Sequence, residues 1–353
     1  MDMGRYAIFW KPLRHLLSRK LEYVLLFGSC FVATQFAYHS TDSYSASSYL
    51  SQVGRAINAS SEFITEQDLT AAVETGLRTK DRYISFLESE HEFNDLYQSY
   101  DSPDRKKYGI RFDRKTGVIT DVLRHSKNYA LLQPGETIIR VAAEEKPEKF
   151  LAAFQASNEL NVVVRGTNKI ERSIKLQSGE LKSLYTEVEG DTARVTMYSF
   201  AYETHVPFVN FLDSLDAKRI HTIEFDLSQC PGGRVNTLTT LLSSLLPKNT
   251  KMFTEVRRNK TIAYSTARTP DFDLTKFNGR IRVLKSARTA SAAEIFIGVL
   301  KYNLPKEKLD VVGDTTYGKW STIQFKKFLK GGLVMTIGRV YLPDGTTYEG
   351  HGI

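Results

Sequence analysis

The stretch Ile281-Arg282-Val283-Leu284, a short turn, and then Thr289-Ala290-Ser291-Ala292-Ala293-Glu294 predicts a buried strand that leads directly into a helix. A short, mainly apolar run of this kind is typical of a buried strand. Beyond Glu294 the apolar positions recur at helical spacing, at Ile295, Phe296, Val299 and Leu300. Ser291 therefore lies where the helix begins, close to unpaired backbone N–H groups and to the positive end of the helix dipole.

A second short strand, Val311-Val312-Gly313, is followed by a glycine-bearing loop that ends in Lys319. A serine becomes a nucleophile when a base takes its proton, and a lysine can be that base if burial keeps its amine neutral. Ser–Lys pairs are a known variant of the serine hydrolase arrangement. Spacing alone leaves a second interpretation open, in which Ser291 is a helix N-cap and Lys319 a solvated charge.

Three motifs in a fixed order favour the catalytic interpretation. They are DLSQCPGG at 226–233, TASAAEI at 289–295 and GDTTYGK at 313–319. They resemble the D-L-R-x-N-P-G-G, S-A-S-A-S-E-I and G-x-x-T-x-G-K motifs of the C-terminal processing peptidases, also called tail-specific proteases. These are serine proteases with a Ser–Lys dyad and a PDZ domain. The resemblance covers the chain from about Phe63 to its last residue.

The resemblance implies that Ser291 is the nucleophile and Lys319 the general base of a serine endopeptidase. We expect the amide of Gly232 or Gly233, together with that of Ala292, to form the oxyanion hole. Glycines at the carboxyl end of a strand let backbone N–H groups approach a substrate carbonyl, and donors held in place there lower the barrier by several kcal/mol.

The chain departs from the family pattern at two places. Ser228 and Cys230 stand where the first motif of the family has arginine and asparagine. A glutamine that orients the lysine usually lies four residues after it, but Ile323 occupies that position and Gln324 comes one residue later. We expect Gln324 to take this role if a bulge brings it back.

The predicted fold is a multidomain α/β (α+β) protein with a ClpP/crotonase-like protease core, because strands and helices alternate after Glu187. The predicted parts are a basic N-terminus (1–20), a membrane segment (21–41), a linker with a helical region (42–104), a PDZ-like domain (105–187) and the catalytic core (188–353). Within the helical region, the pattern from Thr65 to Leu96 predicts an amphipathic helical hairpin.

Short strands and turns between Tyr108 and Leu176 resemble a PDZ domain, with a helix expected at Pro147–Phe154. Tyr108-Gly109-Ile110-Arg111 stands at the place of the loop that binds a peptide's terminal carboxylate. In that mode of recognition the peptide also adds a strand to the sheet edge. A small sandwich without a peptide groove is the alternative.

An apolar run from Tyr23 to Tyr38 follows a basic segment that includes Arg14, Arg19 and Lys20. Basic residues before such a run predict a cytoplasmic N-terminus and an exported remainder. We expect an uncleaved signal anchor in the inner membrane of a cell envelope, with the catalytic part on the periplasmic side. A cleaved signal peptide and a buried core helix are the competing interpretations.

The formal net charge of +8 does not indicate a nucleic-acid partner, because no basic run is interleaved with aromatic residues. The two cysteines, Cys30 and Cys230, are not expected to pair, and no metal-binding or dinucleotide-binding motif is present, so we expect no cofactor. The expected partners are protein or peptide substrates with accessible C-termini, and an adaptor or a second copy of the chain is possible. A non-catalytic binding protein on the same scaffold is the rival function.

Overall fold

The computed structural model describes residues 51–52, 55, 66–87, 89–99, 108–113, 115–328 and 331–353. The predicted membrane segment at 21–41 lies outside these residues. Within the described part of the chain, no helix combines the length and apolar character that crossing a bilayer requires. The chain divides into two compact units, Met1–Phe86 and Leu87–Ile353.

The first unit contains helix α3 (Glu66–Arg78), which ends where the backbone N–H groups of Lys80 and Asp81 both bond to the carbonyl of Leu77. Strand β1 (Ser85–Leu87) follows, so the helical pattern expected from Thr65 to Leu96 is interrupted. The second helical segment is α4 (Glu90–Ser99). The helical hairpin prediction was wrong in this respect, because a turn at 79–81 and an extended stretch separate the two helices.

Residues 108–178 form a β-rich region in two small sheets. The first pairs β2 (Ile110–Phe112) with β3 (Ile119–Val122), and the second has the order β4-β5-β6, with β4 at Thr137–Val141, β5 at Glu159–Arg165 and β6 at Glu171–Gln177. Helix α5 (Pro147–Ala156) begins with a proline in its first turn, where the missing N–H costs no hydrogen bond. The 3-10 turn η2 (Tyr129–Leu131) lies between β3 and β4. One buried cluster, which includes Tyr108, Phe150 and Val164, holds these elements together.

The larger region is an α/β domain with a sheet in the order β13-β12-β9-β8-β7. The strands are β7 (Leu184–Glu189), β8 (Thr192–Met197), β9 (Thr222–Asp226), β12 (Arg280–Lys285) and β13 (Leu309–Gly313). All neighbours pair in parallel except β7 with β8, which are antiparallel. The carboxyl ends of the parallel strands therefore meet at one edge, which is where sites in α/β domains are built.

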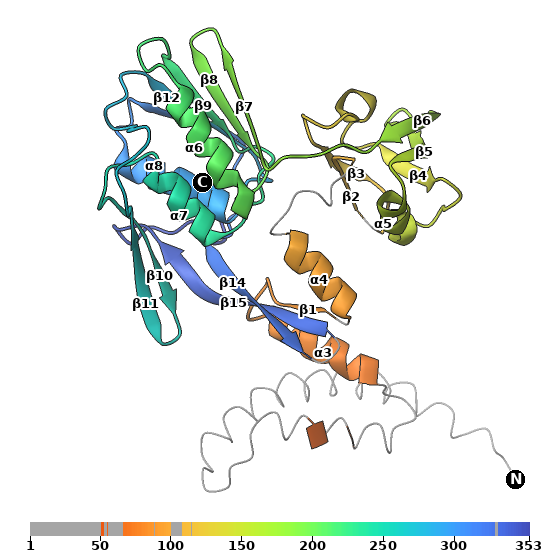
Figure 1. Cartoon of the computed structure of the whole chain (residues 1–353). Coiled ribbons are helices and arrows are strands. Elements are labelled where there is room, and N and C mark those ends of the chain that lie inside the picture. The colour runs from red at the N-terminus through yellow and green to blue at the C-terminus, as the bar shows by residue number, and fades with distance from the viewer. Residues whose placement is uncertain are drawn as a thin grey trace, which may run out of the picture. The chain divides into compact units, whose positions relative to one another are not determined.

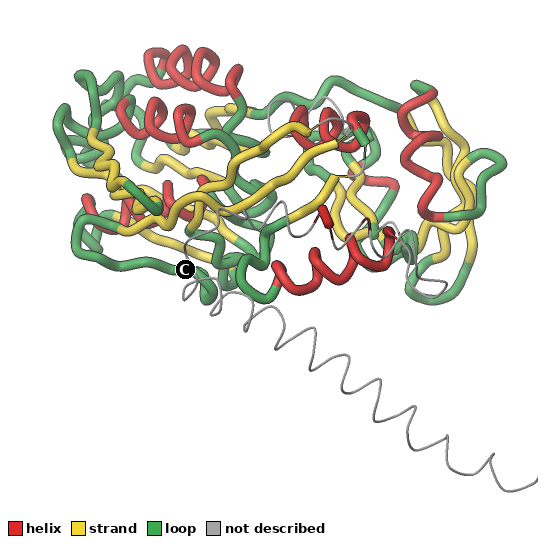
Figure 2. Tube along the Cα trace, turned by 90° about the horizontal axis from the view of Figure 1, so that it is seen from below, coloured by secondary structure: helices red, strands yellow, loops and turns green. Residues whose placement is uncertain are grey.

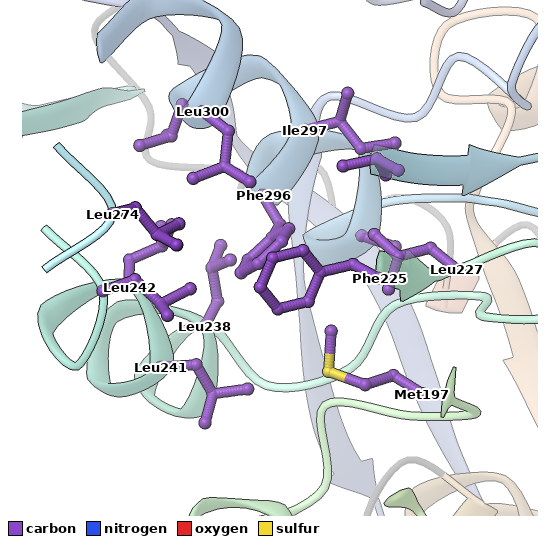
Figure 3. Close-up of a cluster of buried hydrophobic side chains, with 14 of the residues drawn as sticks. Met197, Phe225, Leu227, Leu238, Leu241, Leu242, Leu274, Phe296, Ile297 and Leu300 are labelled. Carbon is purple, nitrogen blue, oxygen red and sulfur yellow. The ribbon is translucent and has the colours of Figure 1, made fainter. Parts of the chain in front are cut away.

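Three helices pack next to one another along this domain: α6 (His205–Ser214), α7 (Val235–Ser243) and α8 (Ala292–Asn303) (Figure 1). A short 3-10 turn, η3 (Tyr202–Thr204), precedes α6. Apolar residues on these helices and on the strands form the main core, where the rings of Phe225 and Phe296 lie 5.3 Å apart (Figure 3). This core fixes β9 against α8, and both elements carry sequence motifs.

A second sheet contains β10 (Lys251–Arg257), β11 (Lys260–Ser265), β14 (Ser321–Phe328) and β15 (Gly331–Tyr341). Strand β15 lies between β14 and β10, and all these pairs are antiparallel. Figure 2 shows the strands of both sheets in yellow and the helices in red. Because β14 begins two residues after Lys319, the second sheet sets the path of the chain as it leaves the third motif.

Candidate active site

The first motif turns sharply at the end of β9. Oδ1 of Asp226 accepts hydrogen bonds from the Ser228 backbone N–H at 3.0 Å and from the Ser228 hydroxyl at 2.6 Å. A side chain that bonds the backbone two residues ahead makes a compact turn. Ser228 therefore has a local structural partner at the position where the family has arginine.

The second motif places Ser291 at the N-cap of α8 with φ 56° and ψ −123°. A positive φ is unfavourable for a residue with a Cβ and costs about 1–3 kcal/mol, so the surroundings must hold this conformation in place. The Ser291 backbone N–H bonds to Oε2 of Glu294 at 2.8 Å. On either side of this turn, the Ala290 N–H bonds to the Cys230 carbonyl at 3.1 Å and the Tyr317 N–H to the Thr289 carbonyl at 3.0 Å.

Gly232 lies against the turn that carries Ser291. A Cβ added to Gly232, whose φ is +100°, would lie 2.8 Å from Cβ of Ser291 and 2.9 Å from the Ala292 nitrogen. A Cβ on Gly233 would instead meet the backbone of Phe200, within 2.6 to 2.8 Å. The structure thus brings Gly232, Ser291 and the Ala292 amide together, while Gly233 packs against Phe200, which forms an isolated bridge three residues after β8.

The third motif approaches the same turn from β13. Lys319 is half-buried, and its backbone N–H bonds to Oε2 of Glu294 at 2.8 Å. The loop before it is anchored by Lys285, whose Nζ donates to the carbonyls of Gly313 at 3.1 Å and Asp314 at 2.8 Å. Burial, assisted by the nearby Lys301 charge, lowers the pKa of Lys285.

Glu294 is the residue that the sequence interpretation missed. Its side chain has no exposed surface, and its two carboxylate oxygens accept hydrogen bonds from both the second and the third motif. Its place at the third position of the helix, after a serine N-cap, is a signal that predicts a bond to the N-cap amide. The bonds to a loop 22 to 25 residues further along depend on tertiary structure.

Gln324 does not lie where the family's glutamine is expected. The bulge is present, but its extra residue is in β15, since Thr322 pairs with Gly338 and Ile323 with Thr336. The alternation of β14 itself is unchanged, so Gln324 and Ile323 point to opposite faces. Gln324 is exposed and Ile323 is half-buried. The expectation that a bulge would bring Gln324 to the position of Ile323 was therefore wrong.

The residues expected to bind a peptide terminus lie at the start of β2. The Tyr108 hydroxyl donates to the Ser157 carbonyl at 2.9 Å, and Gly109 has φ +67° beside the Ser126 side chain. Ile110 is half-buried. Among the described residues, β2 pairs with β3 alone, so its other edge has no strand partner within that part of the chain.

Arg111 has partners of its own. Its guanidinium lies 3.5 Å from Oδ2 of Asp121 and donates to the carbonyl of Gln229 at 3.2 Å. Burial lowers the pKa of Arg111, and the Asp121 carboxylate opposes that shift. The side chain of Arg111 is therefore engaged by Asp121 and Gln229.

Gln229, within the first motif, makes further contacts with β3. Its side-chain amide donates to Oδ1 of Asp121 at 2.7 Å and to the carbonyl of Val122 at 3.0 Å. Arg288, three residues before Ser291, bonds to the carbonyl of Thr120 and lies 3.3 Å from Oδ1 of Asp121. Two loops of the candidate site are thus held against β3.

Residues 191–353 match the model of peptidase family S41. The carboxy-terminal processing protease CtpB of Bacillus subtilis (strain 168) is 24% identical over 318 residues, which are 83% of this chain. The chain spans 64% of the length of that curated relative.

Two solved structures have a similar fold. The photosystem II D1 C-terminal processing protease superposes with a TM-score of 0.58 at 16% identity, covering 86% of this chain and 84% of that one. A structure from Bacteroides fragilis NCTC 9343 assigned to the S41 proteases gives a TM-score of 0.51 at 13% identity, covering 77% of this chain and 79% of that one. At these identities the likeness concerns the fold. The predicted resemblance to the C-terminal processing peptidases is therefore confirmed, with residues 191–353 matching the model of peptidase family S41.

Proposed function

We propose that this protein is a serine endopeptidase of the C-terminal processing type, with Ser291 as nucleophile and Lys319 as general base. One observation carries the proposal. Three segments far apart in the sequence, ending in Gly232, Ser291 and Lys319, are joined by hydrogen bonds around the start of α8. The match of residues 191–353 to the model of peptidase family S41 supports the same reaction class.

The reaction follows from the roles of these groups. Lys319, neutral when partly buried, takes the proton from the Ser291 hydroxyl as its oxygen attacks the scissile carbonyl carbon. The carbonyl oxygen becomes an oxyanion held by the amide of Ala292 and by that of Gly232 or Gly233. Lys319 then gives the proton to the leaving amine. In the second half of the reaction, Lys319 takes a proton from a water molecule, whose oxygen attacks the acyl carbon. The bond to Ser291 then breaks, and Lys319 returns the proton to the Ser291 oxygen.

Residues 108–178 serve in this proposal as a PDZ domain that captures the C-terminal tail of a client protein. The edge of β2 that has no strand partner among the described residues supports this role, because an extended peptide can add to such an edge as a further strand. Phe112 of β2 lies 5.6 Å from the buried Phe154 of α5, ring centroid to ring centroid, so apolar side chains of the core adjoin this strand. Tails that end in apolar residues are the expected ligands.

The clients we propose are envelope proteins, met on the periplasmic side of an inner membrane to which residues 21–41 anchor the chain. The sequence pattern of a basic segment followed by an apolar run supports this placement. A partner that delivers clients, or a second copy of the chain, remains compatible with the proposal.

The test uses the full chain and an unfolded protein with an apolar C-terminus. We expect the parent to cleave it, and Ser291→Ala and Lys319→Ala to lose cleavage while still binding the tail. Gly345→Ala is the matched control, because Gly345 has a positive φ of +86° but no neighbour within 4 Å of an added Cβ. Equal loss of cleavage and tail binding in Ser291→Ala would contradict the separate roles of the two regions.

The same experiment tests the rival hypothesis, in which the chain is a non-catalytic binding protein. The position of Gln324, exposed and on the opposite face of β14 from Ile323, favours that rival because Gln324 then does not stand at the position of the family's glutamine. Tail binding without cleavage by the parent, repeated with an envelope extract that supplies any adaptor, would support the binding protein.

A further inference from the structure

We propose that Glu294 is the positioning residue of this site: its buried carboxylate ties the turn that carries Ser291 to the loop that carries Lys319. The catalytic consequence rests on the proposed function. The tie itself is a property of the fold and can be measured without any substrate.

Each carboxylate oxygen of Glu294 accepts two hydrogen bonds. Oε2 accepts from the backbone N–H of Ser291 and from that of Lys319, each at 2.8 Å. Oε1 accepts from the Thr316 hydroxyl at 2.5 Å and from the Gly318 N–H at 2.7 Å. Bonds to an ionised oxygen are shorter and stronger than neutral ones. A single oxygen atom therefore sets the separation between the backbones of the nucleophile and the base.

Burial makes this tie rigid. Glu294 has no exposed surface, and a carboxylate removed from water is costly unless hydrogen bonds satisfy it. Each of its four recorded donors is a backbone N–H or a hydroxyl, which carries no formal charge. If one segment moved away, a buried charge would lose part of its solvation, so the four bonds are held as a set.

A simple helix cap explains only part of this arrangement. A glutamate at this position of a capping box bonds the N-cap amide, which here is that of Ser291. The other three donors belong to the loop Thr316–Lys319, which a cap does not need. The extra bonds join two catalytic motifs, which is why we assign a role in the reaction.

Thr316 extends the tie to the segment 350–353. Its hydroxyl donates to Glu294 and accepts from the Ile353 N–H at 2.7 Å, while the Thr316 N–H bonds to the Ile353 carbonyl at 3.2 Å. The Gly350 N–H bonds to the Gly318 carbonyl at 2.9 Å. The base-bearing loop is thus held between Glu294 and the segment 350–353.

The chain contains a matched control in Glu255, which is also without exposed surface. It accepts two bonds from Arg257, at 2.7 and 3.0 Å, one from Tyr264 at 3.0 Å and one from Thr322. Glu255 therefore matches Glu294 in burial and number of bonds but joins β10, β11 and β14 rather than the two catalytic motifs.

The first experiment compares Glu294→Gln with Glu255→Gln in the full chain by steady-state cleavage. An amide has one acceptor oxygen and one donor NH2, so Glu294→Gln cannot accept all four bonds. A displacement of about 1 Å can cost on the order of 10²-fold in rate, so we expect kcat to fall by that factor with KM within about twofold. Glu255→Gln should keep kcat within about threefold. Thr316→Ser should retain activity that Thr316→Val loses.

The second experiment measures hydrogen exchange of the Ser291, Gly318 and Lys319 amides. We expect Glu294→Gln to lose protection at all three together, and Glu255→Gln to keep it. Unchanged protection in Glu294→Gln, or equal losses of kcat in both glutamine variants, would overturn the assignment. If the parent itself cleaves nothing, the proposed function fails while exchange still decides whether Glu294 forms the tie.

Discussion

At the scale of single residues, the site depends on backbone conformations that most amino acids avoid. Ser291 has a positive φ beside Gly232, and the two touch so closely that a Cβ on Gly232 would overlap the nucleophile turn. The same crowding that forces glycine at 232 limits how Ser291 can move. Contacts from two separate motifs therefore hold Ser291 in its strained backbone conformation.

We predict that Gly232→Ala lowers kcat by about 10² to 10³-fold, the usual effect of losing one oxyanion donor. An added Cβ would lie 2.7 Å from the Ala290 carbonyl oxygen and 2.9 Å from the Ala292 nitrogen, so the turn must shift. Cleavage kinetics provide the measurement. Gly345→Ala carries a similar backbone strain in open space and should leave kcat unchanged; a comparable loss there would remove the steric explanation.

His125 provides a prediction on pH. Its ring stacks on Tyr185 with centroids 3.9 Å apart, and its Nδ1 lies 2.8 Å from the Tyr198 hydroxyl. Burial, with a contribution from the Arg124 charge, lowers the pKa of His125. Because protonation then favours the unfolded chain, the contribution of His125 to stability is present above about pH 6.5 and lost as pH falls through the folded-state pKa.

The measurement is the midpoint of thermal unfolding between pH 8 and pH 5. His125→Phe retains a ring that can stack on Tyr185 but cannot titrate, so its midpoint should fall less steeply toward acid than that of the parent. Parallel curves for the two proteins would mean that His125 does not contribute to the acid dependence.

At the scale of elements, α4 shows how one helix is fixed to a strand pair. The ring of Phe93 in α4 is stacked with that of Tyr97 and meets the ring of Phe325 in β14 edge to face. The ring centroids are 6.1 Å apart in each pair. Gly332 of β15 lies under the Phe93 ring, where a Cβ would approach Cδ2 to 2.1 Å. The close approach requires a residue without a side chain at 332.

We therefore predict that Gly332→Ala destabilises the docking of α4 by about 1–3 kcal/mol, the usual cost of overpacking. Hydrogen exchange of the α4 amides measures this cost directly. In the double variant with Phe93→Ala the added methyl group meets empty space, so the two effects should be less than additive. Full additivity would show that Phe93 and Gly332 do not interact.

At the scale of the whole molecule, the β-rich region 108–178 meets the α/β domain through polar contacts and a small apolar cluster. The contacts of Gln229 and Arg288 with Thr120, Asp121 and Val122 form the polar part. Leu123, Leu181 and Tyr198 form the apolar part. The polar contacts come from the loops that carry the first and second motifs.

We predict that the double variant Gln229→Ala with Arg288→Ala loosens this contact and exposes the connection at 178–183 to limited proteolysis. The reason is that Asp121, which is 2% exposed by its side chain, loses two of its partners. Arg280→Ala removes an exposed ion pair to Asp310 on the core and is the control. Equal cleavage rates in both variants would contradict a docking role.

Much of the α/β core was predictable, because its apolar periodicity is strong. Ser291 was expected to lie where the helix begins, and it is the N-cap of α8. The strand predicted at Ile281–Leu284 lies within β12. The helical hairpin near the N-terminal side was mispredicted because a short, half-buried strand, β1, has little periodicity to distinguish it.

The sequence by itself determined the three motifs, their order and the strand–helix junction at Ser291, since each depends on residues adjacent in the chain. Only the tertiary structure decided that Glu294 joins Ser291 to Lys319, that Gly232 rather than Gly233 touches the nucleophile turn, and that Gln324 points away. The physical reason is that these contacts link segments tens of residues apart. Their geometry is set by packing of the parallel sheet against α8, which no local pattern encodes.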